Sequence, residues 1–109
     1  MTNPFLKITN EYDPIAEHII DAVAEIGETS VEEILSDSRK AIICRMRATA
    51  MMLIRHYTKL SLPQIGSMFG RDHTTVMSAI RQAQMMGAKF EGYEKLCDQI
   101  MENANARSN

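Results

Sequence analysis

The sequence predicts an all-α protein, a small bundle of about five to six helices. Three observations lead to this prediction. The chain has 109 residues, a length typical of one domain. Its five glycines and three prolines are few, and no stretch keeps the apolar–polar alternation of a β-strand. Apolar residues recur instead at helical spacing, between residues that cap helices.

The first helix is predicted from Pro14 to about Ile26. Asp13 is a favourable N-cap, and proline is favoured at the first helical position. Gly27 is expected to end the helix. The predicted core face consists of Ile15, Ile19, Ala22, Val23 and Ile26.

A short second helix is predicted after Ser30, because Ser30 and Glu33 have the spacing of a capping box. This helix should turn Ile34 and Leu35 inward. Residues 36–40, Ser-Asp-Ser-Arg-Lys, break the apolar pattern and are expected to form a loop.

A long helix is predicted from roughly Ile42 to Thr58. We expect Arg47 and Arg55 on other faces than its apolar stripe. That stripe consists of Ile43, Met46, Ala50, Leu53, Ile54 and Tyr57.

The next helix is predicted at 62–69. Ser61 and Gln64 form a second capping box, and Pro63 stands in the first turn, where a missing N–H costs nothing. Gly70 is expected as a left-handed C-cap. The core residues of this helix are Ile65, Met68 and Phe69.

Asp72 is predicted to cap a further helix at 73–86, which Gly87 should end. Its core residues are Val76, Ile80 and Ala83. Two short helices joined by so tight a turn form a helix-turn-helix, here over about residues 62–86.

A final helix is predicted from about Tyr93 to Asn103, with Leu96, Ile100 and Met101 packed inward, and residues 105–109 are expected to fray. The predicted organisation is an N-terminal extension, a helix-turn-helix domain, and a C-terminal helix with its tail, at residues 1–12, 13–88 and 89–109.

The net charge of −2 at first argues against a nucleic-acid partner, but the charges are unevenly distributed. Residues 1–37 carry nine acids and one cation, a net −8, and residues 91–109 carry a net −2. Residues 38–90 carry nine cations and one acid, a net +8. This asymmetry favours a polyanionic partner over a merely solvated cationic face, which would mix in more acids.

The predicted turn carries side chains suited to reading bases. A helix-turn-helix places the start of its second helix in the major groove of DNA. Arginine can donate two hydrogen bonds to guanine, aspartate can accept one from cytosine, and threonine offers a methyl and a hydroxyl group. Taken alone, Asp72 could serve only as an N-cap and His73 only as an exposed residue. The candidates are Arg71, Asp72, His73, Thr74 and Thr75.

The stretch from Ser61 to Val76, SLPQIGSMFGRDHTTV, closely resembles the signature of the C-terminal DNA-binding domain (domain IV) of the bacterial replication initiator DnaA. The likeness extends more weakly from about Ile15 to Arg81. It implies a sequence-specific double-stranded DNA-binding protein that recognises initiator-box-like sites and regulates replication initiation or transcription. Its matching segments are Leu62-Pro63-x-Ile65-Gly66, Phe69-Gly70 and Arg71-Asp-His-Thr-Thr-Val76.

The resemblance also implies roles for particular residues. The base-reading role falls on residues 71–75, and a basic loop that enters the minor groove corresponds to Arg39, beside Lys40. Contacts with the DNA backbone fall on Arg47, Arg55, Leu62 and Pro63. Charge adds Arg45, Lys59 and Arg81 to these, and position at a helix N-terminus adds Ser61 and Gln64.

Other function classes find little support. The sequence has no Gly-x-x-x-x-Gly-Lys-Ser/Thr loop, so with methionine at position 1 we expect the DNA reader without an ATPase, and no nucleotide. The histidines and the two cysteines lie far apart, which predicts no enzyme, metal or cofactor. No apolar run approaches the roughly 18 residues of a membrane span, and the N-terminus does not resemble a signal peptide. The expected location is the cytoplasm, at the nucleoid.

Two alternatives stay open beside a monomeric DNA-binding protein. One is a dimeric helix-turn-helix repressor that uses the final helix as its interface. The other is a protein-interaction module that docks a partner through the acidic N-terminal helix.

Overall fold

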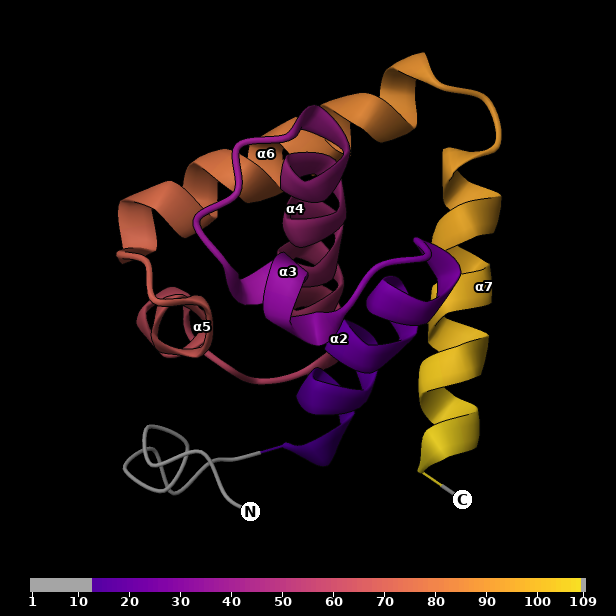
Figure 1. Ribbon diagram of the computed structural model, residues 1–109, viewed down its shortest axis with the longest axis horizontal. Coiled ribbons are helices and arrows are strands. Elements are labelled where there is room, and N and C mark those ends of the chain that lie inside the picture. The colour runs from indigo at the N-terminus through magenta and orange to yellow at the C-terminus, as the bar shows by residue number, and fades with distance from the viewer. Residues whose placement is uncertain (1–12, 109) are drawn as a thin grey trace.

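The computed structural model describes residues 13–108, which form six α-helices and no β-strand (Figure 1). The predicted all-α fold is therefore confirmed, while the predicted extension at residues 1–12 lies outside the described residues. None of these helices has an apolar stretch long enough to cross a membrane. In order they are α2 (Pro14–Ile26), α3 (Val31–Leu35), α4 (Ala41–Tyr57), α5 (Leu62–Phe69), α6 (His73–Lys89) and α7 (Tyr93–Arg107).

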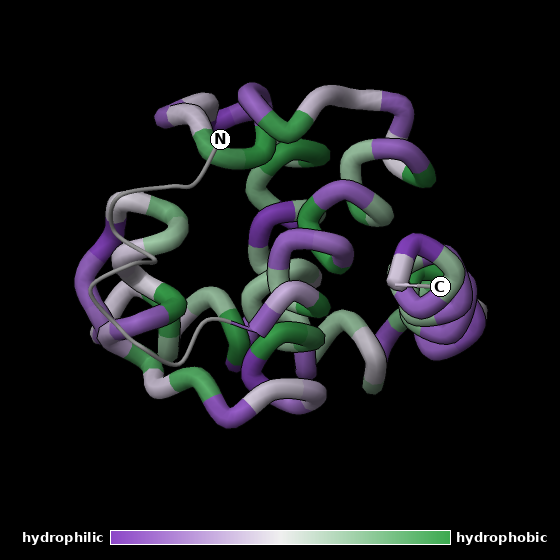
Figure 2. Tube along the Cα trace, turned by 90° about the horizontal axis from the view of Figure 1, so that it is seen from below, coloured by the Kyte–Doolittle hydropathy of each residue, from purple (hydrophilic) through white to green (hydrophobic). Residues whose placement is uncertain are grey.

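Helix α4 lies at the centre of the bundle and packs against α2, α3, α5 and α6, while α7 packs along α2. Each helix turns an apolar face toward a shared core, so hydrophobic residues recur in short stretches along the chain (Figure 2). The fully buried side chains include Ile19, Val23, Ile34, Met51, Ile54, Leu60, Ile65, Val76 and Ile100.

Side-chain caps fix where the helices begin, as predicted. Asp13 Oδ1 accepts a hydrogen bond of 3.0 Å from an amide in the first turn of α2, and Ser30 Oγ accepts one of 3.1 Å in α3. At the start of α5, Ser61 Oγ accepts from the amide of Gln64, and Gln64 Oε1 accepts from the amide of Ser61. These bonds satisfy amides that have no partner within the first turn of their own helix.

The turn between α5 and α6 depends on two glycines. Gly70 has a φ of 68°, the predicted left-handed conformation, and ends α5. Within α5, the carbonyl of Gly66 accepts the amide of Arg71 at 2.8 Å. A Cβ added at Gly66 would lie 2.3 Å from the carbonyl oxygen of Arg71. Helix α5 and the turn can therefore approach this closely because residue 66 has no side chain.

The apolar stripe of α4 differs from the prediction at its end. Ile43, Met46, Ala50, Leu53 and Ile54 are buried as predicted, but Tyr57 is 49% exposed. The prediction that Tyr57 belongs to the core is wrong, because the last turn of α4 extends beyond the core. Its ring lies instead edge-on to the ring of His56, with centroids 4.7 Å apart.

Helix α6 runs to Lys89, so the prediction that Gly87 ends it is wrong. A glycine inside a helix costs about 1 kcal/mol relative to alanine, which one exposed position tolerates. The chain reverses instead at Gly92, whose φ of 91° is in the left-handed region.

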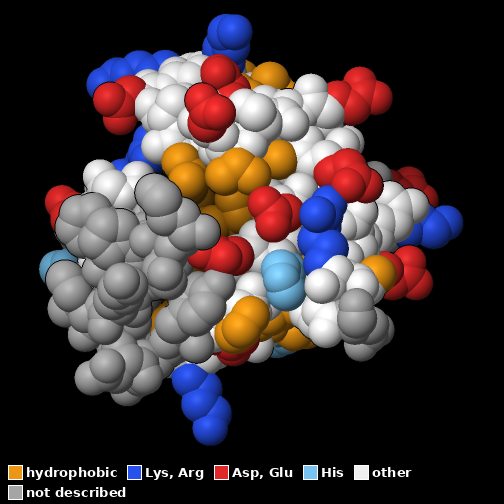
Figure 3. All heavy atoms as spheres, turned by 60° about the horizontal axis from the view of Figure 1, so that its bottom comes forward, with side chains coloured by type: hydrophobic (Ala, Val, Ile, Leu, Met, Phe, Trp, Pro, Cys, Tyr) orange, Lys and Arg blue, Asp and Glu red, His pale blue; other side chains and the backbone are white. Residues whose placement is uncertain are grey.

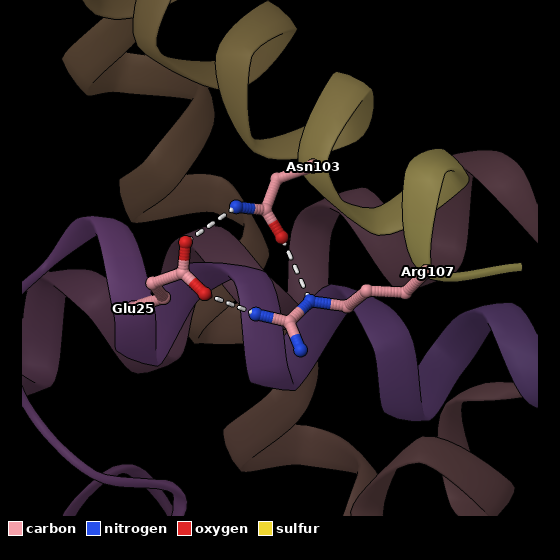
Figure 4. Close-up of polar contacts among 3 residues, drawn as sticks. All are labelled: Glu25, Asn103 and Arg107. Carbon is pink, nitrogen blue, oxygen red and sulfur yellow. Dashed lines mark hydrogen bonds and ion pairs between the residues drawn. The ribbon is translucent and has the colours of Figure 1, made fainter.

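Helix α7 continues to Arg107, although the sequence predicts an end at Asn103 and a frayed tail. The last turns are held against α2 (Figure 4). Arg107 forms a 2.5 Å ion pair with Glu25, and the Asn103 amide donates to the other oxygen of the Glu25 carboxylate at 3.0 Å. Ser108 Oγ lies 2.9 Å from Nδ1 of His18. The fraying prediction is therefore wrong through Ser108, and Asn109 lies outside the described residues.

We expect Gly66→Ala to lower the free energy of unfolding by about 1–3 kcal/mol, because the added methyl group displaces the Arg71 carbonyl. Chemical denaturation measures this loss. The matched control is Gly87→Ala, also within a helix, where a Cβ meets the Tyr93 ring at an ordinary contact distance of 3.6 Å. This control should stabilise by up to about 1 kcal/mol. Equal stabilisation by both substitutions would contradict the close approach at Gly66.

Candidate nucleic-acid interface

The N-cap and first turn of α6 present four exposed polar side chains to solvent, those of Asp72, His73, Thr74 and Thr75. Asp72 Oδ1 accepts hydrogen bonds from the Thr75 amide at 2.9 Å and from Thr74 Oγ1 at 3.1 Å. The bonds from Thr75, followed by the one from Thr74, lower the pKa of the Asp72 carboxyl below its ordinary value. Asp72 is thus an ionised N-cap at neutral pH, and its predicted cap is confirmed.

Arg71 precedes these residues but turns its guanidinium back toward the protein. Its Nη1 donates to the carbonyl of Phe69 at 2.6 Å, and its Nη2 donates to the carbonyl of Ser36 at 2.8 Å. Burial, followed by the nearby charge of Arg47, lowers the pKa of Arg71 below its ordinary value. The structure therefore brings Arg71 to the start of α6 while its donors bind carbonyls of the chain itself.

Residues 36–40, here called the basic segment, connect α3 to α4 and expose Arg39 and Lys40. Serine hydroxyls shape the segment locally. Ser36 Oγ donates to the Glu33 carbonyl at 2.7 Å and accepts the Ser38 amide at 3.1 Å, and Ser38 Oγ accepts the Lys40 amide at 3.3 Å. The predicted loop is confirmed, and its bond to Arg71 places it beside the turn that opens α6.

Arg47 is only 7% exposed, so the expectation that it lies off the buried side of α4 is wrong. Its Nε donates to the carbonyl of Ile34 at 2.8 Å, and its Nη2 donates to the carbonyls of Ser36 and Ser38 at 2.9 and 3.2 Å. The carbonyls of Ser36 and Ser38 lie between helices, so they need donors from elsewhere in the chain. Helical spacing in the sequence could have indicated that Arg47 is buried, because position 47 is four residues after Ile43 and three before Ala50 on the apolar stripe of the helix.

The remaining candidate cations are exposed and spread along α4 and α6. Arg45 and Arg55 are ten residues apart on α4, about 15 Å along the helix axis. Arg55 donates to the Leu60 carbonyl at 2.9 Å, beside exposed Lys59, and Arg81 is exposed farther along α6. At the start of α5, Pro63 is exposed, and Ser61, Leu62 and Gln64 are half-buried.

Acidic side chains lie mainly on α2, α3 and α7, although Asp37 is exposed within the basic segment and Asp72 at the start of α6. Asp and Glu side chains are spread over the face seen in Figure 3, toward the lower side of Figure 1. Helices α2 and α3 expose Glu17, Glu25 and Glu32. Within residues 13–108, no group of three or more His, Cys, Asp or Glu side chains is arranged to hold a metal ion.

The family model described as "Bacterial dnaA protein helix-turn-helix" matches residues 16–83, from the first turn of α2 to most of α6. The chain belongs to the bacterial DnaA helix-turn-helix family. The match confirms the resemblance that the sequence indicated. It includes the basic segment, α4 and the complete turn between α5 and α6 of this DnaA-type domain.

Two similar proteins are named chromosomal replication initiator protein DnaA. The one from Synechococcus sp. (strain JA-2-3B'a(2-13)) is 41% identical over 96% of this chain, and the one from Picosynechococcus sp. (strain ATCC 27264 / PCC 7002 / PR-6) is 38% identical over 94%. The chain spans about a quarter of their length, 24% and 23%.

A solved crystal structure of a DNA replication initiation factor is also similar to this DnaA-type domain. The TM-score is 0.75 with 32% sequence identity, over 93% of this chain and 31% of that one. Both relatives and this structure therefore match the chain beyond residue 83, where the family model ends, and into α7.

We expect Arg47→Ala to lower the free energy of unfolding of this DnaA-type domain by about 2–3 kcal/mol, because three carbonyls lose a charged donor. The matched control is Arg45→Ala, two residues earlier on α4, where the exposed side chain should contribute within about 0.5 kcal/mol. Urea denaturation of both variants measures the difference. A small and equal effect of the two substitutions would show that the buried bonds of Arg47 contribute little.

Proposed function

We propose that this chain is a sequence-specific double-stranded DNA-binding protein that recognises initiator-box-like sites through α5 and α6. One observation carries the proposal. The DnaA-type helix-turn-helix exposes Asp72, His73, Thr74 and Thr75 together at the start of its second helix. In a helix-turn-helix this is the part that enters the major groove.

Residues 71–75 would read the base edges. Asp72 can accept from a cytosine amino group, and Thr74 and Thr75 can contact a thymine methyl group or a phosphate. Arg71 would donate to guanine, for which its guanidinium must leave the carbonyls of Phe69 and Ser36. His73 can donate or accept from an exposed position in the first turn.

Arg39 and Lys40 would enter the adjacent minor groove, which attracts cations most strongly where it is narrow. The exposed cations would contact phosphates on either side. In the first turn of α5, the amides of Ser61 and Gln64 already donate within the capping box, and Pro63 has no amide hydrogen. We therefore propose that the Leu62 amide of this turn donates to a phosphate. The residues that we propose for contact with the DNA backbone are Arg45, Arg55, Lys59, Ser61, Leu62, Pro63, Gln64 and Arg81. Arg47, which the resemblance also implied, is left out of this proposal because it is only 7% exposed.

The proposed role is regulation of replication initiation or transcription by occupying such sites, without ATPase activity and with no enzymatic step or cofactor. The sequence has no phosphate-binding Gly-x-x-x-x-Gly-Lys-Ser/Thr loop that an ATPase would need. A DNA ligand would place the protein in the cytoplasm, at the nucleoid.

A monomer is the proposed binding state. The apolar residues of α7 that a dimer interface would need, Ile100, Met101 and Ala104, are buried within the chain, where α7 packs against α2. The acidic face of α2 stays a proposed site for a protein partner.

Selection of bound sequences from a random duplex pool tests the proposal. We expect one enriched site that resembles initiator boxes. The site should be asymmetric, because a monomer has no two-fold axis that would require a palindromic sequence. A palindrome with half-sites one helical turn apart would favour the dimeric repressor instead. Enrichment of no sequence would refute specific recognition.

On the selected site, we expect His73→Ala to cost about 1–3 kcal/mol and to relax the preference at one base pair, because a base contact is lost. Arg55→Ala should weaken all duplexes alike and reduce the slope of log affinity against log salt by about one unit. Titration of specific and random duplexes at two salt concentrations separates these effects. An equal loss for His73→Ala on random DNA would contradict base reading.

A further inference from the structure

We infer that Arg47 is a positioning residue, which holds the basic segment so that Arg39 and Lys40 meet the minor groove while α6 occupies the major groove. This inference rests on the proposed function, and it assigns to Arg47 a task other than a contact with phosphate. The observations that carry it are the burial of Arg47, its three carbonyl acceptors, and the carbonyl that it shares with Arg71.

The donors of Arg47 are directed into the protein. A guanidinium has five N–H groups. Arg47 directs Nε to Ile34, directs Nη2 to Ser36 and Ser38, and places Nη1 3.8 Å from Sγ of Cys44. With 7% of its surface exposed, the side chain offers little to a phosphate. Its charge therefore serves to bind the backbone of the basic segment.

The basic segment depends on these bonds for its position. Its serine bonds are local, because each joins residues two or three apart in the sequence. Arg47 reaches the segment from α4, nine and eleven residues away in sequence, and so fixes it relative to the centre of the bundle. Without such bonds, a five-residue loop with two exposed cations would sample many conformations.

The carbonyl of Ser36 joins the two proposed halves of the DNA-binding surface. Arg47 Nη2 binds it at 2.9 Å and Arg71 Nη2 binds it at 2.8 Å. If Arg71 leaves this carbonyl to reach a guanine, Arg47 still holds it. The minor-groove segment can then keep its place while the recognition turn changes.

The test uses base analogues that alter one groove at a time. Replacing adenine by 2,6-diaminopurine adds an amino group in the minor groove and leaves the major-groove edge unchanged. Replacing A·T by inosine·cytosine changes the major-groove edge and leaves the minor groove without that amino group. Each analogue is placed at the A·T pairs of the selected site, and the penalty is the ratio of affinities for the unmodified and modified duplexes.

For the wild-type chain we expect a diaminopurine penalty of about ten-fold at one or more positions. Arg47→Lys, which keeps the charge but lacks the forked donors, should reduce this penalty to about three-fold or less. Its inosine penalties should stay unchanged. Because each penalty is a ratio measured on one protein sample, partial unfolding of the variant cancels.

Three controls sharpen the result. Arg45→Lys should keep both penalties, because a change at this exposed, proposed phosphate contact alters the affinity for modified and unmodified duplexes alike. Arg39→Ala should abolish the diaminopurine penalty, and adding Arg47→Lys to it should have no further effect on that ratio. Arg71→Lys should keep the diaminopurine penalty, since Arg47 still holds the segment.

The inference is overturned if Arg47→Lys keeps the wild-type diaminopurine penalty, or if Arg47→Ala lowers the salt slope by about one unit while keeping that penalty, which would indicate a phosphate contact. It is also overturned if the wild-type chain selects a site but shows no diaminopurine penalty. The proposed function itself fails only if the wild-type chain selects no site.

Discussion

The carbonyl oxygen of Ser36, bound by the guanidinium groups of Arg47 and Arg71, is the contact on which the arrangement of the surface depends. It joins the basic segment, the central helix α4 and the turn that opens α6. Two cations can converge there because a carbonyl dipole accepts a hydrogen bond from each of them. The surface is therefore organised by backbone acceptors inside the protein as much as by exposed side chains.

The same contact explains how the positive charge is divided between two tasks. Residues 38–90 carry a net +8, but the burial of Arg47 and the inward bonds of Arg71 commit part of this charge to the fold. The other cations of this stretch remain exposed: Arg39, Lys40, Arg45, Arg55, Lys59, Arg81 and Lys89. Counting cations in the sequence thus overstates the charge that the free protein presents to a polyanion.

Local patterns were sufficient to predict the helices, because each cap acts over two or three residues. Asp13, Ser30, Ser61 and Asp72 all cap as predicted. The error at the end of α7 concerns tertiary contacts, the long-range bonds of Arg107 to Glu25, whereas the error at Gly87 concerns how well one exposed glycine is tolerated within a helix. The start of α6 was predictable as a candidate site from its residue types. The role of the Ser36 carbonyl was not, because every residue has a carbonyl and only the folded chain shows which one two arginines share.

The clamp formed by Glu25, Asn103 and Arg107, with the contact between His18 and Ser108, brings α2 and the last turn of α7 together. In Figure 1 the start of α2 and the end of α7 both lie at the lower side, whereas the basic segment runs along the upper left. The clamp therefore joins the first and last described helices on a different side of the domain from the basic segment. The contacts that hold the two outer helices together are accordingly separate from the contacts of Arg47 and Arg71 that hold the basic segment.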